Sequence, residues 1–382
     1  MSSAATLTKT QALLVLNGLP RLGPVTLRRL LDEFGEDPHQ VLGASRSALR
    51  QVERVGPDTA DIIVNWQQHF DLAREEARLA KAGAAFVALT DDDYPKPLKK
   101  IYDPPLGLYM VGPLRPAIKS IAIIGSRRTT LYGRSVAKRL ASDLTRLGFC
   151  VVSGLARGID TEAHQGAVES GGDTAAVLGC GVDIVYPPEN IDLYKAIGER
   201  GVVISELPFG TRASKTTFPM RNRLIAGMSA ATVVVESGLS GGSMITARFA
   251  AEQNRPVFAV PGRIDQDSSA GCHQLIRDGA VLLTSVDDLI NELAYGGASQ
   301  QELDLPESAT EASRERKSGS LEGLSEEERL VLTPLLEGEA LGRDSLAEKT
   351  GLPVAVVSST LLMLELKRRV GKRVDGAYEF RT

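Results

Sequence analysis

Two stretches of the sequence carry several basic side chains and no acidic ones. Residues 119–142 contain Lys119, Arg127, Arg128, Arg134, Lys138 and Arg139, and residues 207–235 contain Arg212, Lys215, Arg221 and Arg223. Phe218 lies among the cations of the second stretch. Cations neutralise phosphates and a flat ring stacks on a base, which is the combination that single-stranded nucleic acid requires. The alternative is that Phe218 fills the core while the arginines pair with distant carboxylates, and residue spacing leaves both readings open.

Four short segments follow apolar, strand-like runs and supply groups that bind anions. These segments are residues 125–129, 153–158, 218–223 and 240–243. In an open α/β sheet, ligands bind at the carboxyl ends of the strands, where loops lead into helix N-termini. Glycines such as Gly125 and Gly154 allow backbone to approach a phosphate, and Ser126 with the next helix's amides donates to its oxygens. Arginine guanidinium groups suit bidentate phosphate contacts.

The elements that must position these segments form a recognisable alternation between residues 118 and 293. Apolar runs occupy residues 118–126, 149–154, 174–179, 201–206, 231–237, 255–262 and 280–285. Amphipathic segments such as Tyr132–Leu147, Ile159–Ser170 and Ser243–Asn254 separate them. Near-continuous apolar strands separated by helices indicate a mostly parallel sheet covered on both faces. We therefore predict a doubly wound α/β domain over 84–295, introduced by two further strand-like runs at 84–90 and 106–112.

The N-terminal 83 residues have a helical pattern. Two pieces, 17–35 and 52–66, each place Gly-Pro before a run of apolar residues at helical spacing. Glycine supplies a turn and proline suits the first helical position. The pattern is typical of helix-hairpin-helix pairs, whose turn amides touch DNA backbone. A purely structural module of four or five helices is the alternative.

The C-terminal part is predicted to be a linker followed by a small domain. Residues 296–320 are polar, lack aromatic residues and cannot bury enough surface to fold, so they read as a flexible linker. In 321–382, Ser325 and Glu328 form a capping box, Asp344–Thr350 and Val354–Arg368 read as helices, and 371–380 reads as a hairpin. Three helices and a hairpin make a winged-helix domain.

Composition limits the class of protein. The chain has 382 residues, three cysteines without CxxC spacing and a formal net charge of −4, so we expect a reducing, cytoplasmic setting and no disulfide framework. We expect no signal peptide, because the N-terminus lacks a basic start, and no membrane span, because no apolar run is long enough. We expect no cofactor, because neither GxxxxGK[ST] nor a GxGxxG that opens the first helix occurs.

The acidic and hydroxyl side chains near these loops are predicted to have structural roles and not catalytic or metal-binding ones. Asp160 and His164 share a helix face, but only four histidines occur in the chain and no metal site is predicted. We expect Asp160 to cap the helix that follows Gly158. Glu206 and Glu236 end strands and are expected to accept hydrogen bonds from loop amides. No serine has a visible histidine partner for nucleophilic catalysis, so no catalytic residue is predicted.

Several segments, taken in order, resemble one protein family. They read IAIIGSRRTTLYG, VVSGLARGIDTEAH, AVLGCGVDIVYPPEN, ISELPFG, FPMRNRLIAGMS, VVVESGLSGGSMITARFAAEQNRPVFAVPG and GCHQLIRDGA. This series is similar to the DNA-processing protein A family, DprA or Smf, over residues 95–290. The N-terminal helices and the winged helix look like accessory domains that some members carry.

The resemblance implies an extended Rossmann fold in a homodimeric protein that binds and protects single-stranded DNA and delivers it to the recombinase RecA during natural transformation. It implies a DNA pocket formed by Ser126, Arg127, Gly154, Lys215, Phe218, Arg221 and Asn222. With the loop residues described above, the candidate DNA-binding set is Gly125, Ser126, Arg127, Arg128, Gly154, Lys215, Phe218, Arg221, Asn222, Arg223, Gly242 and Ser243. Such a protein is not an enzyme.

Two other functions compete with this one. Rossmann-like nucleotide hydrolases of the lysine-decarboxylase type use PGGxGTxxE, and this chain, aligned on Gly241-Gly242, has Arg248 where that motif has its glutamate. Replacing a carboxylate by a cation removes charge that the hydrolysis uses. The second alternative is a duplex-DNA regulator that binds through the winged helix, whose Lys367, Arg368 and Arg369 supply positive charge.

Overall fold

The computed structural model describes residues 7–113, 119–295, 324–336, 341–367, 369–372 and 377–380. These residues form two compact units, one within residues 1–303 and the other within 304–382. The helical N-terminal part and the predicted α/β domain therefore belong to the same unit. The predicted linker, 296–320, lies outside the described residues.

Seven helices precede the first strand in the described part of the chain. They are α1 (Lys9–Gly18), α2 (Pro24–Glu33), α3 (Pro38–Gly43), α4 (Arg46–Leu49), α5 (Pro57–Val64), α6 (Trp66–His69) and α7 (Leu72–Ala82). Gly23 and Gly56 are N-caps, and Pro24 and Pro57 take the first helical position, as the Gly-Pro pattern predicts. The number exceeds the expected four or five because α4 and α6 are single turns. DNA contact by these turns stays a prediction.

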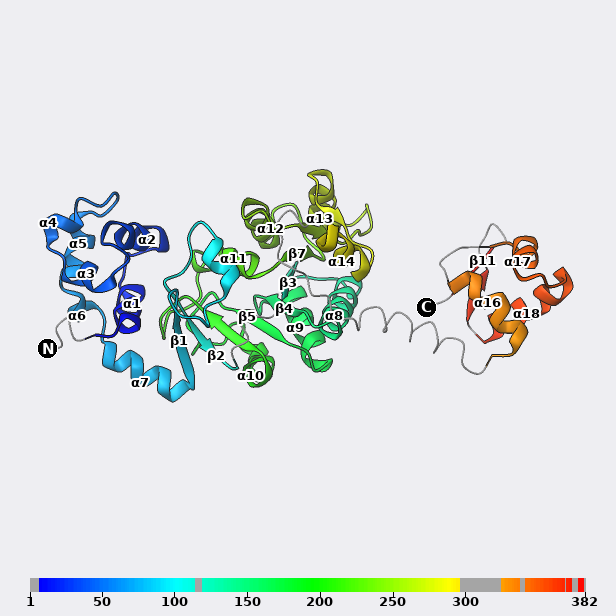
Figure 1. Cartoon of the computed structure of the whole chain (residues 1–382), viewed down its shortest axis with the longest axis horizontal. Helices are drawn as coiled ribbons and strands as arrows, with labels where there is room; N and C mark the ends of the chain where they lie inside the picture. Colours follow the sequence, from blue (N-terminus) through cyan, green and yellow to red (C-terminus); the bar gives the residue numbers. More distant parts are fainter. Residues whose placement is uncertain are drawn as a thin grey trace. The chain divides into compact units, whose positions relative to one another are not determined.

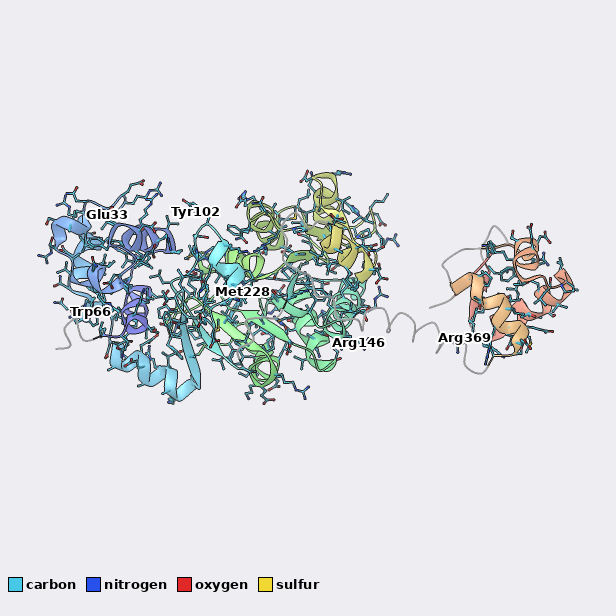
Figure 2. The ribbon with its side chains drawn as sticks, in the orientation of Figure 1. Glu33, Trp66, Tyr102, Arg146, Met228 and Arg369 are labelled. Carbon is cyan, nitrogen blue, oxygen red and sulfur yellow. The ribbon has the colours of Figure 1, made fainter. Side chains whose placement is uncertain are left out.

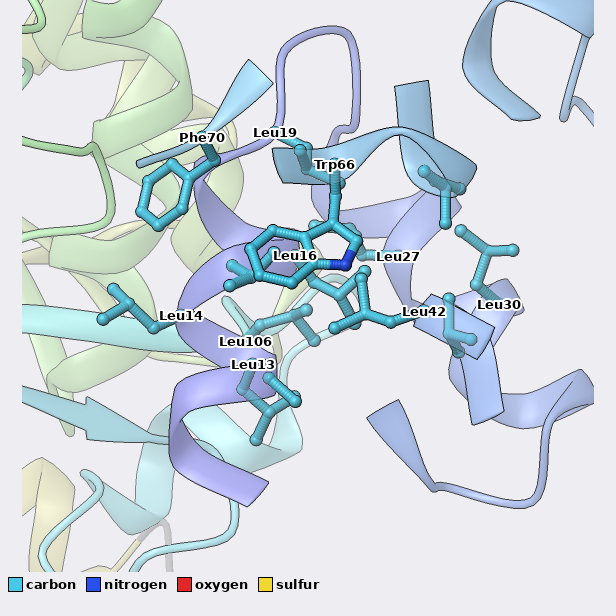
Figure 3. Close-up of a cluster of buried hydrophobic side chains, with 14 of the residues drawn as sticks. Leu13, Leu14, Leu16, Leu19, Leu27, Leu30, Leu42, Trp66, Phe70 and Leu106 are labelled. Carbon is cyan, nitrogen blue, oxygen red and sulfur yellow. The ribbon is translucent and has the colours of Figure 1, made fainter. Parts of the chain in front are cut away.

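The helical part has an apolar core around one tryptophan. Trp66 is buried, and its position in α6 is labelled in Figure 2. Figure 3 shows leucines of α1, α2 and α3 around its indole ring, among them Leu16, Leu27 and Leu42. Leu106, which immediately precedes a strand of the sheet, belongs to the same cluster. The helices are thus packed onto the sheet through a continuous apolar core.

One nine-stranded sheet forms the centre of this unit (Figure 1). Its strands are β1 (Ala84–Ala88), β2 (Gly107–Val111), β3 (Ser120–Ile124), β4 (Cys150–Ser153), β5 (Thr174–Val177), β6 (Val202–Ser205), β7 (Ala231–Val234), β8 (Val257–Ala259) and β9 (Val281–Leu282). Their order is β1-β2-β6-β5-β4-β3-β7-β8-β9. Strands β3 to β9 pair in parallel, and β1 and β2 are antiparallel additions next to β6. All nine strand-like runs of the sequence are strands, and the mostly parallel α/β fold is confirmed.

Helices cover both faces of the sheet because successive strand side chains alternate between them. Ile121 and Ile123 of β3 belong to a core with α8 (Leu131–Arg146), α9 (Ile159–Glu169) and α14 (Val286–Tyr295). Ala122 and Ile124 belong to the opposite core, with α11 (Thr217–Met228), α12 (Gly242–Glu252) and α13 (Asp267–Arg277). Helix α10 (Ile191–Arg200) packs against α9, β5 and β6, and the 3₁₀ helices η2 (Lys96–Lys100) and η3 (Pro188–Asn190) complete this unit.

Polar contacts also join the helical part to the sheet. Glu75 of α7 is 3% exposed and accepts a hydrogen bond from the backbone amide of Phe209, just beyond β6, at 3.0 Å. Arg78 forms an ion pair with Glu75 and donates to the Phe209 carbonyl oxygen. Asn17 of α1 donates to the carbonyl oxygen of Glu206 at 2.9 Å. The loop after β6 is therefore held by two of the N-terminal helices.

The second unit is the predicted winged-helix domain. It consists of α16 (Glu326–Leu336), α17 (Arg343–Thr350), α18 (Val354–Leu366) and a hairpin of β10 (Val370–Lys372) and β11 (Tyr378–Phe380). The capping box is present, since Ser325 and Glu328 exchange side-chain to backbone hydrogen bonds. The predicted Asp375-Gly376 turn lies outside the described residues. None of the described helices combines the length and the apolarity needed to cross a bilayer.

Candidate nucleic-acid interface

The order of the strands places a crevice next to β3. From β3 the chain builds β4, β5 and β6 outward on one side and then β7, β8 and β9 on the other. Loops after β3 and β7 therefore leave the sheet in opposite directions, which opens a ligand-binding crevice at the carboxyl ends of these strands. A pocket of about 500 Å³ lies there. Of the predicted site residues, it is lined by Gly125, Ser126, Arg127, Arg128, Lys215, Phe218, Arg221, Asn222, Gly242 and Ser243.

Three cations at the pocket are exposed and have no carboxylate partner within the described chain. They are Arg127 and Arg128 in the loop after β3, and Lys215 just before α11. Other members of the two acid-free stretches do have partners, such as Lys138, which pairs with Glu169 on the neighbouring helix α9 at 2.7 Å. Arg127, Arg128 and Lys215 thus come from two segments that are far apart in sequence and meet at this pocket.

Phe218 lies half-buried in the first turn of α11, beside these cations. The guanidinium carbon of Arg127 is 4.9 Å from the centroid of its ring, within the range of a cation–π interaction. Tyr186, from the loop after β5, has its ring centroid 5.6 Å from that of Phe218. Phe218 is therefore an accessible ring at the pocket and not a plug of the core.

The loop after β3 is held in place by its own hydrogen bonds and by Glu236 at the end of β7. The Ser126 hydroxyl donates to the Arg128 carbonyl oxygen and accepts from the Arg128 amide. The Glu236 carboxylate accepts from the amide of Thr130, at 2.9 Å, and from the hydroxyls of Thr129 and Thr130. The prediction that Glu236 accepts hydrogen bonds from loop amides is confirmed. Ser126 shapes the loop, and its hydroxyl proton is already used.

Arg221 lines the pocket and depends on Gly154 in a way that the sequence does not reveal. Arg221 is 5% exposed and donates to the carbonyl oxygens of Gly154 and Val177, at the tips of β4 and β5. A Cβ at Gly154 would lie 1.9 Å from Nη1 of Arg221. Gly154 does not line the pocket, so its predicted contact with phosphate is corrected: the missing side chain makes room for the guanidinium of Arg221. Gly125 is similarly crowded, by Ile159 and by the Glu236 carbonyl oxygen.

Asp160 holds the loop after β4 and is not a helix cap. Gly158 is the N-cap of α9, and the Asp160 carboxylate accepts from the amides of Gly154 and Ala156, at 3.2 and 3.4 Å. The predicted capping role is therefore wrong, because the side chain points back over the loop. Burial raises the pKa of Asp160, an effect that the Arg221 charge opposes.

His164 is buried below this loop as a neutral base. The Leu155 amide donates to its Nε2 at 3.3 Å, so Nδ1 carries the proton and donates to the Thr174 hydroxyl at 2.7 Å. Burial lowers the pKa of His164 to about 3. No group of three potential metal ligands occurs among the described residues.

Arg223 does not reach the pocket, which contradicts its predicted role. Its guanidinium is 4% exposed and makes two 2.6 Å contacts to the Glu206 carboxylate, with Asp103 at 3.2 Å on its other side. The reason is helical geometry. Residues 218–223 lie in α11 and not in a loop, so Arg223 is rotated by about 200° from Arg221 around the helix axis. The expectation that Glu206 binds amides is likewise corrected, since its partner is Arg223.

The beginning of α12 completes the pocket. Gly241 is its N-cap without a side-chain hydrogen bond, so the amides of Gly242 and Ser243 open the helix with its positive dipole end. Asn222 donates to the Gly242 carbonyl oxygen at 3.4 Å, which links α11 to this turn. The Ser243 hydroxyl donates to Ser237 and is buried. Backbone amides are the groups that this turn offers to an anion.

Sequence reasoning missed the loop after β5. It selected segments that contain glycine, serine and basic residues, whereas this loop contributes the aromatic side chain of Tyr186. The signal was available, because Tyr186 is followed by two prolines in the segment between two predicted strands, 174–179 and 201–206. Ser237 and Gly238, directly after β7, line the pocket as well and were not selected.

The fold and the pocket define a Rossmann-like α/β protein with a pocket lined by basic side chains at its topological switch point. Residues 85–294 match the family model of DNA recombination-mediator protein A, and residues 315–376 match the DprA winged helix domain. The first match spans more than half of the chain. The protein therefore belongs to the DNA recombination-mediator protein A family, also named DprA or Smf.

Relatives and solved structures agree with this assignment. Protein Smf of Synechocystis is 36% identical to this chain, over 71% of this chain and 69% of the Smf chain. A putative DNA processing protein DprA of Mycobacterium tuberculosis is 40% identical, over 69% of this chain and 65% of the relative. The crystal structure of DprA from Streptococcus pneumoniae superposes with a TM-score of 0.64 at 34% identity, covering 75% of this chain and 98% of that one. A Helicobacter pylori DprA structure, described for its single-stranded DNA binding mode, has a TM-score of 0.50 at 31% identity, covering 55% and 96%.

His164 predicts a pH dependence of stability. Its pKa is about 3 when folded and about 6.5 when unfolded, so below pH 6.5 the unfolded chain binds a proton that the folded chain does not. This contribution to the unfolding free energy is complete above pH 6.5 and falls by ~1.4 kcal/mol per pH unit below it. Denaturant unfolding between about pH 7.5 and pH 5 should show a shallower pH dependence for His164→Gln than for wild type. The exposed His69→Gln should behave like wild type, and equal slopes in all three proteins would contradict the assignment.

Arg223→Gln should destabilise the fold without removing a DNA contact. It leaves the carboxylates of Glu206 and Asp103 unpaired in a buried setting, which costs about 3–5 kcal/mol of unfolding free energy. The exposed Arg212→Gln, from the same acid-free stretch, should change it by less than ~0.5 kcal/mol. Chemical denaturation measures both. Unchanged stability of Arg223→Gln combined with weaker DNA binding would restore the original prediction.

Proposed function

We propose that the protein binds single-stranded DNA without sequence preference at the pocket beside β3. The observation that supports this most strongly is the meeting of Arg127, Arg128 and Lys215, all exposed and without acidic partners in the described chain, next to the ring of Phe218. The cations bind phosphates, and the first-turn amides of α12 add donors for phosphate oxygens. The ring of Phe218 stacks on a base.

Single strands fit this site better than duplexes. A base in a duplex is paired and stacked, so its face is not free to lie on Phe218. Every base has such a face and every nucleotide has a phosphate, so neither contact depends on sequence. The pocket therefore binds groups that all nucleotides share. Its affinity should fall steeply with salt, because each neutralised phosphate releases counterions.

The finer parts of the function rest on family membership. We propose that the protein protects single strands and delivers them to the recombinase RecA during DNA uptake, as a cytoplasmic homodimer that catalyses no reaction and uses no cofactor. The family match over residues 85–294 supports this role. The structure of H. pylori DprA, which concerns that protein's single-stranded DNA binding mode, supports the choice of ligand.

Two observations weigh against the competing functions. Arg248, which replaces the hydrolase glutamate, has a side chain 74% exposed, pairs with Glu252 and does not line the pocket. Helix α18, which would enter the major groove in a duplex reader, contains no lysine or arginine between Val354 and Leu366. It exposes Leu362 and Met363 instead. Neither a cleaving carboxylate nor a basic recognition helix is available at the expected place.

Lys215→Gln tests the electrostatic part. Losing one phosphate contact should weaken binding of a labelled oligothymidine and reduce the slope of log affinity against log salt by about 0.7, with unfolding free energy unchanged. Fluorescence anisotropy over a range of salt concentrations measures this. Arg74→Gln, an exposed cation on α7 that does not line the pocket, is the matched control. The same slope in Lys215→Gln and Arg74→Gln would refute the assignment of Lys215.

Phe218→Ala tests the stacking part. Removing the ring should cost about 1–3 kcal/mol of binding free energy if a base stacks on it. The same anisotropy assay measures the loss, and circular dichroism checks that the variant is folded. A folded variant with wild-type affinity would show that Phe218 has no contact with DNA.

A further inference from the structure

Tyr186 stands at the tip of β5, next to Phe218 but outside the residues that line the pocket. Its ring centroid is 5.6 Å from that of Phe218, and the two ring planes are inclined by 44°. The side chain is 38% exposed, which is high for an aromatic residue beside a core helix. Burial alone therefore does not account for its position, and one part of the ring is open to a ligand.

The geometry of the two rings excludes a base between them and favours one base on each. Stacked nucleotides are about 3.4 Å apart along a strand, so a base inserted between two parallel rings needs about 6.8 Å. The observed separation is smaller than this, and the rings are not parallel. It is larger than the spacing of two stacked bases, so neighbouring nucleotides reach both rings when the strand is unstacked.

The basic side chain that interacts with the Tyr186 hydroxyl is itself paired. Arg157, which interacts with the Tyr186 hydroxyl, pairs with Glu189 through its Nε. This ion pair neutralises the charge of Arg157. A ligand at Tyr186 would therefore be held by its flat face and not by phosphate contacts, in contrast to the cationic pocket next to it.

We propose that Tyr186 is a second base platform, which continues the DNA site beyond Phe218 over the tip of β5. This proposal rests on the proposed function and adds to it the direction in which the strand leaves the pocket. One nucleotide stacks on Phe218, with its phosphates at Arg127 and Lys215. The next stacks on the exposed part of Tyr186.

The test compares oligonucleotides that reach both rings with a ligand that fills only the pocket. Affinity for a thymidine dodecamer, measured by anisotropy, should fall by about fivefold to 100-fold in Tyr186→Ala. Tyr186→Leu, which keeps bulk against Phe218 but lacks a π face, should lose affinity as well, and Tyr186→Phe should keep it. Competition by thymidine 3′,5′-bisphosphate should be nearly unchanged in all three. The salt slope should also stay at its wild-type value, unlike that of Lys215→Gln.

Tyr102→Ala is the matched control, because Tyr102 is 84% exposed and lies on a different loop (Figure 2). Wild-type affinity of a folded Tyr186→Ala protein, while Phe218→Ala binds weakly, would overturn this inference and leave the proposed function intact. An equal loss for the dodecamer and the bisphosphate would also overturn it, since Tyr186 would then only position Phe218. If wild type fails to bind the dodecamer, the proposed function fails and this inference with it.

Discussion

The site depends on one buried cation, the guanidinium of Arg221. It donates to carbonyl oxygens at the tips of β4 and β5, so two neighbouring strands and helix α11 are tied together at one point. Gly154 leaves the space for it, and Asp160 supplies the compensating charge while it organises the loop after β4. Because a charge in the interior is costly unless it is paired and hydrogen-bonded, this arrangement tolerates little displacement. The register of α11, and with it the position of Phe218, follows from it.

Whether a basic side chain can contact a ligand depends on its burial more than on the charges that neighbour it in the sequence. Arg221 and Arg223 belong to an acid-free stretch, yet both are buried and donate hydrogen bonds to carbonyl oxygens or carboxylates. Arg127 and Lys215 remain exposed beside a half-buried ring. A chain with a net charge of −4 can therefore still place at one pocket exposed cations that have no acidic partner in the described part of the chain. Net charge is a poor guide to such a protein's partners, because the local field at the pocket acts on the ligand.

The strands were predictable because each parallel strand is apolar on both faces, and this signal survives without knowledge of the tertiary contacts. The residues whose roles were predicted wrongly or missed are those whose roles depend on tertiary contacts. Residues 218–223 were predicted to be a loop that leads into a helix, whereas α11 already begins at Thr217, and Pro219 is compatible with its first turn. That one shift moved Arg223 from the pocket to the carboxylates of Asp103 and Glu206. Gly154 was understood as a phosphate-binding glycine, since no sequence pattern shows that an arginine from another helix fills the space above it. Tyr186 was overlooked because its loop lacks the serine and basic residues by which the other segments were selected, and its contact with Phe218 is tertiary.

The antiparallel strands at one side of the sheet have a further effect. β1 is an edge strand, and α1 and α7 pack against it, while the opposite edge strand, β9, is only two residues long. Exposed edges recruit further strands, and covering or shortening them prevents this. The sheet is consequently closed to growth by main-chain pairing at β1 and offers very little for it at β9. Edge-to-edge pairing between copies of this protein is therefore disfavoured at these two strands, and this protects the sheet against aggregation through its backbone.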